Sequence, residues 1–120
     1  MSAKRGDPVE RPDPWEFVFG DLKAAKGWET LRRAAPGPLD QAWTAITSDP
    51  TRTDGRQHQL KGNLGTGTVE GVSLPQWQYE VTGGGRLWYL VDAKNRRLYL
   101  SHAGTGHPKA TDKGVRRGKR

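Results

Sequence analysis

Residues 77–101 decide the fold of this chain, and they read WQYEVTGGGRLWYLVDAKNRRLYLS. Apolar and polar side chains alternate over residues 77–81, and a glycine-rich turn at 82–85 precedes the largely apolar run 86–91. A second turn at 93–95 leads into residues 96–101. Alternation and turns of this kind are typical of strands joined by short connections. The stretch therefore predicts a three-stranded antiparallel meander.

A hairpin of two helices is predicted upstream of this meander. Asp21 can cap a helix whose apolar residues recur at helical spacing from Ala24 to position 35, with Gly27 as a weak point. The sequence Pro-Gly-Pro at 36–38 ends that helix, and Pro38 suits the first position of a second helix, which closes at residues 48–50. The two helices share an apolar face that can cover one side of the sheet.

A further strand is predicted before the helices, at residues 15–19, because aromatic side chains occupy every second position there. Residues 51–71 are polar and glycine-rich, with candidate strands at 57–61 and 66–69. We expect an α+β fold of the order β-α-α-β-β-β, in which the two-helix hairpin packs on a twisted antiparallel sheet.

Size and composition indicate one small domain. The 120 residues suffice for a single core, so we expect a flexible arm at 1–14, a folded domain at 15–112 and a basic tail at 113–120. The absence of cysteine excludes disulfides and thiolate chemistry. The sequence shows neither a secretory signal nor a membrane span, and we expect a cytoplasmic protein.

The chain is strongly basic, with a formal net charge of +7 and a pI of about 10.1. Lysine and arginine gain binding free energy by releasing counterions from phosphates, so a nucleic acid is the expected partner. Five of the last eight residues are basic and none is acidic. A basic tail of this kind can also be no more than a solvated end.

Three segments of the meander resemble the RelE/ParE superfamily of bacterial type II toxins, namely YEV at 79–81, RLWYLVD at 86–92 and LYLSH at 98–102. In that superfamily an aromatic-rich strand leads through a turn to an arginine-aliphatic-aromatic-tyrosine strand. The resemblance covers roughly residues 15–112. It implies a RelE-like fold, an endoribonuclease that cleaves mRNA, often on the ribosome, and so inhibits translation, and a cognate antitoxin that holds the toxin inactive. The closing GHPKATD at 106–112 departs from the Arg/His-Tyr pair that ends many relatives, which leaves the general acid open.

Metal-independent RNA cleavage needs a base for the ribose 2′-hydroxyl, a cation for the pentacovalent phosphorane and an acid for the departing 5′-oxygen. Arg86 begins the central strand, and its planar fork suits two phosphate oxygens. By resemblance it matches the arginine that these toxins place at the scissile phosphate. The alternative is a structural role, such as an ion pair with Glu80 across the hairpin.

Two histidines, His102 and His107, are the candidates for general acid and base, because the ordinary pKa of histidine lies near neutrality. Lys109 is a candidate for electrostatic support or, with a lowered pKa, for the base. His58 lies in a polar segment without partners in sequence and is interpreted as structural.

Aromatic residues of the central strand can stack nucleic-acid bases. Because neighbouring strand residues face opposite sides, Trp88 shares the open face with Arg86 if Leu87, Tyr89 and Val91 pack under the helices. If the faces are reversed, Tyr89 takes that role. Further RNA contacts are predicted for three basic side chains, Lys61, Arg97 and Lys113.

No motif predicts a cofactor, and the histidines lack the spacing of a zinc site. Two alternatives to the ribonuclease remain open: a ParE-type inhibitor that binds DNA gyrase without cleaving RNA, and a catalytically silent module that binds nucleic acid or an antitoxin. The expected partners are mRNA, the ribosome and the antitoxin. The toxin hypotheses also predict an exposed apolar groove, because an antitoxin buries such a surface with a helix or an added strand.

Overall fold

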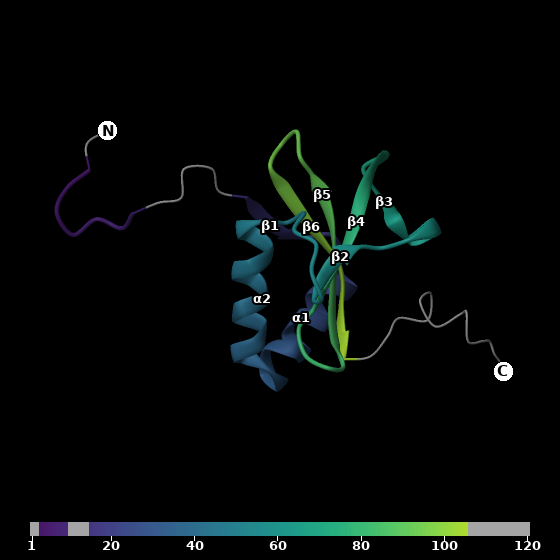
Figure 1. Cartoon of the computed structure of the whole chain (residues 1–120), viewed down its shortest axis with the longest axis horizontal. Coiled ribbons are helices and arrows are strands. Elements are labelled where there is room, and N and C mark those ends of the chain that lie inside the picture. The colour runs from purple at the N-terminus through teal and green to yellow at the C-terminus, as the bar shows by residue number, and fades with distance from the viewer. Residues whose placement is uncertain (1–2, 10–14, 106–120) are drawn as a thin grey trace.

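The computed structural model describes residues 3–9 and 15–105 of the chain. Figure 1 shows two helices beside a sheet whose hairpins diverge at one end. The elements follow in the order β1 (Glu16–Phe19), α1 (Leu22–Ala34), α2 (Pro36–Ser48), β2 (Gln57–Gln59), η1 (Gly62–Gly65), β3 (Thr66–Val69), β4 (Val72–Glu80), β5 (Gly85–Asp92) and β6 (Arg97–Thr105). The predicted α+β class, the helical hairpin and the meander of β4, β5 and β6 are confirmed.

The sheet has the strand order β1-β6-β5-β4-β2, and β3 pairs with the first half of β4. All of its pairs are antiparallel except β1 with β6, which run parallel from Glu16 beside Arg97 to Phe19 beside Leu100. The predicted antiparallel sheet is therefore mixed. The reason is that β1 lies beside β6, the last strand of the meander, and both strands run in the same direction.

The first backbone amide groups of a helix have no acceptor within it. One helix begins at a residue that caps such a group, and the other begins at a proline, which has no N–H. The Asp21 carboxylate accepts a 2.7 Å hydrogen bond from the amide of Ala24, as predicted for the start of α1. The second helix begins at Pro36 instead of the predicted Pro38. A proline is tolerated at the first helical position, where the missing N–H has no intrahelical acceptor, so Pro36 starts α2 one residue after the cap Ala35.

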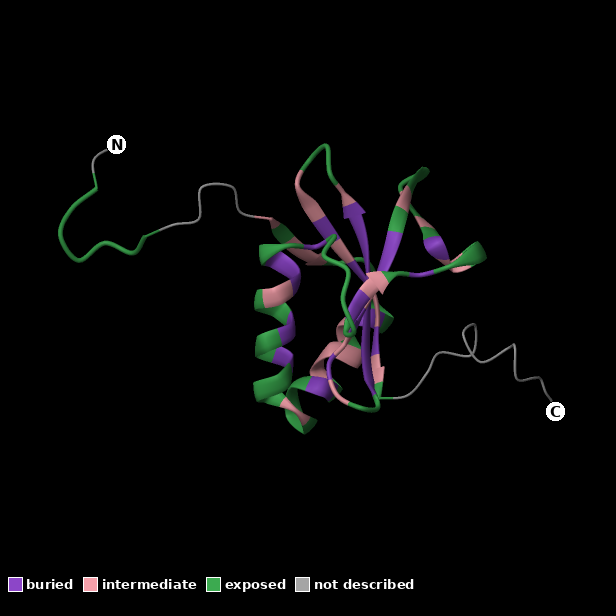
Figure 2. Ribbon diagram, viewed as in Figure 1, coloured by how far each residue is buried: buried purple, intermediate pink, exposed green. Residues whose placement is uncertain are grey.

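The core lies between the helices and one face of the sheet. Figure 2 shows buried segments on the helices and strands where these two layers meet. The first helix packs against β6 and β1, whereas α2 packs against β4. From the central strand, Leu87, Tyr89 and Val91 are part of the core, which settles the two arrangements considered for β5. Trp88 therefore faces the opposite side of the sheet, together with Arg86.

The described part of the predicted domain, residues 15–105, forms one layer of helices on one sheet. The predicted boundaries near 14 and 112 fall on or beyond residues outside the described ranges and stay predictions, as does the basic tail. Among the described helices, none combines the length and the apolar character that a membrane crossing requires.

Candidate nucleic-acid site on the open face

The face of the sheet turned away from the helices is called the open face below. Strand pairing places His58 opposite Gln78, Gln78 opposite Trp88, and Trp88 opposite His102. Directly paired residues of antiparallel strands project to the same side. These four residues therefore form one row across β2, β4, β5 and β6, named the cross-strand row.

The middle of the cross-strand row is held by specific contacts. The indole Nε1 of Trp88 donates a 2.8 Å hydrogen bond to the side-chain oxygen Oε1 of Gln78. On its other side the Trp88 ring lies against the His102 imidazole, with 5.5 Å between ring centroids and 57° between ring planes. Trp88 is thereby fixed between an amide on β4 and an imidazole on β6.

His102 owes its position to an irregularity in β6. Trp88 pairs with His102 whereas Tyr89 pairs with Leu100, so Ser101 is an extra residue without a partner on β5, as in a β-bulge. Both Ser101 and His102 are half-buried, which breaks the alternation of the strand. The Ser101 hydroxyl donates to the Gln76 side chain at 2.6 Å, so the bulge brings two polar side chains to the open face.

The His102 imidazole is partly withdrawn from water. Burial, and next the positive charge of Lys23, lower the pKa of His102 below its ordinary value of 6.5, while Asp21 acts in the opposite direction. Its Nε2 is buried and has no hydrogen-bond partner among the described residues. Neutral imidazole therefore predominates at pH 7, which is the form that can accept a proton.

Arg86 is 8% exposed and holds the turn between β4 and β5. Its Nη1 donates to the carbonyl oxygens of Thr82, Gly83 and Gly85 at 2.9–3.2 Å. Within residues 3–9 and 15–105 it forms no ion pair with Glu80, although the two are paired across the strands. The guanidinium is thus fixed two positions before Trp88 by backbone oxygens.

Burial corrects one predicted RNA contact and limits another. Tyr89 is fully buried under the helices, where its hydroxyl donates to the Pro50 carbonyl at 2.7 Å and accepts from Gln57 at 2.9 Å. Burial raises the pKa of this phenol far above its ordinary value. Tyr89 is therefore a core residue that cannot stack a base. Trp88 is on the open face but only 6% exposed, so it offers little ring surface for stacking.

The remaining basic candidates lie away from the cross-strand row or outside the described residues. Lys61 is exposed in the turn that precedes η1. Arg97 begins β6, five residues before His102, and its Nε contacts the Glu16 carboxylate at 2.8 Å. It also lines a hollow of about 670 Å³ between the diverging hairpins. The predicted site residues outside the described ranges are His107, Lys109 and Lys113.

The row also contains two residues that are not predicted site residues. Gln78 is a polar position of an alternating strand, and His58 is predicted to be structural. The register of β2 and β5 on either side of β4 places both in the row. In the part of the chain that is described, no group of three or more His, Cys, Asp or Glu side chains could hold a metal ion.

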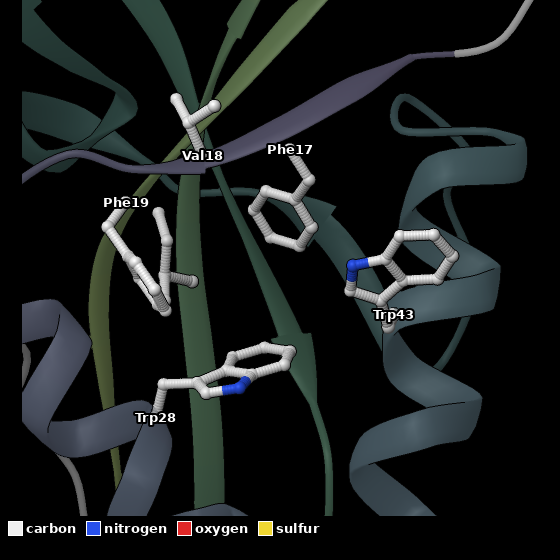
Figure 3. Close-up of a pocket in the computed structure, with 6 residues that line it drawn as sticks. Phe17, Val18, Phe19, Trp28 and Trp43 are labelled. Atoms are coloured by element: carbon white, nitrogen blue, oxygen red, sulfur yellow. The ribbon is translucent and has the colours of Figure 1, made fainter.

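A second surface feature is an apolar groove between β1 and the two helices. A pocket of about 180 Å³ is lined by Phe17, Val18, Phe19, Trp28, Trp43 and Leu100. In Figure 3 the rings of Phe17, Trp28 and Trp43 surround this space. An adjoining hollow of about 320 Å³ shares Trp28 and Trp43 and continues between the helices. The two together are named the tryptophan groove.

No protein-family model matches the chain, and no curated protein matches it by sequence. The structure is similar to a YoeB/ParE toxin from Agrobacterium tumefaciens, with 18% identity and a TM-score of 0.58 over 77% of this chain and 99% of that one. The YoeB dimer from Staphylococcus aureus is also similar, with 12% identity and a TM-score of 0.56 over 78% of this chain and 98% of that one.

A toxin–antitoxin complex, RelBE2 from Mycobacterium tuberculosis, is also similar, with 18% identity and a TM-score of 0.55 over 77% of this chain and 98% of that chain. At such identities the likeness establishes the fold. The chain therefore has the fold of the RelE/ParE toxins, and the predicted resemblance is confirmed at this level.

Proposed function

We infer that this chain is the toxin of a bacterial toxin–antitoxin pair and that it cleaves mRNA in the cytoplasm, with or without the ribosome, and so inhibits translation. The observation that carries the proposal is the geometry of the open face. A half-buried imidazole with a lowered pKa lies across from Trp88, and a guanidinium held by backbone oxygens lies two residues along the same strand. The fold shared with RelE and YoeB toxins supports it.

In the proposed reaction, neutral His102 takes the proton from the ribose 2′-hydroxyl, and the 2′-oxygen attacks the neighbouring phosphorus. Arg86 stabilises the charge of the phosphorane, because only its Nη1 has acceptors among the described residues and its charge is permanent. The bond to the 5′-oxygen then breaks, and that oxygen takes a proton from an acid. His107 is proposed as this acid, with Lys109 in electrostatic support, and the products are a 2′,3′-cyclic phosphate and a 5′-hydroxyl.

Binding of the RNA is proposed to rest on charge, since the accessible stacking surface of the row is small. Lys61, Arg97 and Lys113 would contact phosphates to either side of the scissile bond. Contacts of this type release counterions, so binding should weaken steeply with salt.

An antitoxin is the proposed partner of the tryptophan groove. Such a groove was expected for a toxin, and the RelE and YoeB structures include complexes with RelB and YefM. Trp43 is 44% exposed and Phe19 is 51% exposed, although both are large and apolar. β1 is moreover an edge strand of the described sheet, so its outer side is open to an added strand. An acidic segment with a helical apolar stripe would complement both the groove and the positive net charge of this chain.

One observation favours a second candidate, a ParE-type inhibitor that does not cleave RNA. Arg86 and Trp88 each have a structural explanation, because one holds a turn and the other is covered by its neighbours. Under this hypothesis the open face serves stability and the target is a protein.

The deciding experiment is cleavage of a defined mRNA by the purified protein, with and without translating ribosomes. Arg86→Gln and His102→Gln variants are compared with Arg52→Gln, which removes an exposed arginine that pairs with Asp54 in the loop after α2. We expect cutting by the wild type and the control, and its loss in both open-face variants when circular dichroism shows them folded. If the wild type cuts RNA under neither condition, the ribonuclease hypothesis is wrong, and inhibition of gyrase is measured next.

A further inference from the structure

Trp88 has an environment that base stacking does not explain. Trp88 is 6% exposed, its Nε1 donates a hydrogen bond to Gln78, and its ring lies against the His102 imidazole at a tilt of 57°. A base could reach the ring only by displacing one of these neighbours. The contacts instead link β4 to β6 through the indole, and they end on the group proposed as the base.

The imidazole has few other supports. Its Nε2 makes no hydrogen bond within the described residues. A β-carbon at position 104 would lie 3.3 Å from that nitrogen, so Gly104 leaves the room that the ring occupies. The bulge at Ser101 frees the local backbone from regular pairing. Among the described residues, the contact with the indole is the one ring contact recorded for this imidazole.

Several charged groups lie around this imidazole and must be separated from the effect of the indole. Lys23 and Asp21 act from the start of α1, with opposite effects on the protonated form. Arg86 is on the neighbouring strand, two residues before Trp88, and Glu80 is paired with Arg86 on β4. None of these groups is altered by exchanging an uncharged side chain at position 78 or 88.

We propose that Trp88 and Gln78 form a positioning pair, in which Gln78 fixes the indole and the indole holds the His102 imidazole in one orientation, partly dehydrated. This proposal deepens the proposed function and rests on it for its catalytic consequence. Neither residue touches the substrate. Loss of the pair lets water reach the imidazole, which favours the protonated form and leaves less of the neutral base at a given pH.

The first test is independent of activity and uses the full chain. The titration of the His102 ring protons is followed by NMR, with the resonances assigned by comparison with His102→Gln. Gln78→Met keeps the shape of the side chain and removes the acceptor, and Trp88→Phe removes the indole nitrogen. Gln59→Met is the matched control, because Gln59 is exposed and bonds the Gly65 carbonyl instead of Trp88.

We expect the wild type and Gln59→Met to titrate below the ordinary pKa, with ring protons displaced by the indole ring current. Gln78→Met and Trp88→Phe should raise the pKa of His102 toward its ordinary value and change those ring-proton positions. Gln78 is half-buried, so its variant keeps the test available if Trp88→Phe does not fold. An unchanged titration and unchanged ring protons in Gln78→Met would overturn the proposal.

The second test is the dependence of cleavage on pH. The rate should fall on the acidic side as the base becomes protonated, and in the two variants this fall should move to higher pH by the same amount as the titration. Failure of the wild type to cleave RNA would refute the proposed function while the NMR result stands. Cleavage whose pH profile does not move while the titration does would refute the positioning role alone.

Discussion

Gly27 of α1 packs directly on Ala103 of β6, so closely that a β-carbon at position 27 would lie 1.9 Å from the Ala103 carbonyl oxygen. Beyond residue 100, β6 has no pairing with β1, and α1 covers it there. Glycine weakens a helix by about 0.5–1 kcal/mol relative to alanine. The close packing of α1 on β6, next to His102, offsets this loss of helix stability.

Alanine at position 27 should therefore destabilise the fold although it favours the helix. We expect Gly27→Ala to lower the free energy of unfolding by about 1–3 kcal/mol, the usual range for overpacking. The measurement is urea unfolding followed by tryptophan fluorescence. Gly37→Ala is the control, because Gly37 is also helical and a β-carbon there meets nothing within 4 Å. Equal stability of the two variants would contradict the close packing.

The buried hydroxyl of Tyr89 should contribute measurably to stability. Tyr89→Phe leaves the Pro50 carbonyl without this donor, and Gln57 loses its acceptor on β5. We expect a loss of about 1–3 kcal/mol in unfolding free energy. Tyr79→Phe is a matched control, because Tyr79 is buried in the same core and its hydroxyl has no hydrogen bond to any described residue. A loss as large in the control would show that the hydroxyl contacts of Tyr89 are not the cause.

Stability should depend on pH through His102. Its pKa is lower in the folded protein than the ordinary 6.5, so the unfolded chain binds the proton more readily. The contribution of His102 to the free energy of unfolding is present above pH 6.5. It is lost as the pH falls through the lower pKa of the folded state. We expect the urea midpoint of the wild type to fall more than that of His102→Gln from pH 7 to pH 5. Parallel curves for the two proteins would rule out a depressed pKa.

The tryptophan groove should govern binding of the antitoxin with little effect on the fold. Trp43 is 44% exposed, so Trp43→Ala removes little of the core, yet it removes an aromatic side chain from the centre of the groove. We expect binding of the cognate antitoxin, measured by calorimetry, to weaken at least tenfold. Val72→Ala, at an apolar residue that is 57% exposed outside the groove, should bind like the wild type. Unchanged binding by Trp43→Ala would place the antitoxin elsewhere.

Much of the fold could be predicted because its signals are local. The cap at Asp21, the apolar stripe of α1 and the turns at 82–85 and 93–95 act over a few residues, and the predicted elements agree with those observed. The extension of β4 to Val72 could not be predicted in the same way. Pro75 lies in this segment, and a proline is tolerated there because β4 pairs only with β3 at that end.

The candidate site was predicted by residue type and only in part by position. Arg86 and His102 were selected for a permanent charge and a pKa near neutrality, and both lie on the open face. Gln78 was not predicted because a glutamine in a strand does not indicate catalysis. His58 was not predicted because the register of β2 on β4 cannot be deduced from the sequence of either strand. The base-stacking role of Tyr89 was wrong because its side chain is fully buried in the core.

Amino-acid order alone determined the helices, the turns, the meander and the basic character, since each depends on neighbours in the chain or on composition. Tertiary structure decided which face of β5 is covered, where the bulge at Ser101 turns His102, and what surrounds Trp88. These features depend on pairing between residues far apart in sequence. A shift of one residue in strand register would exchange the two faces, so only the packed sheet can specify the site.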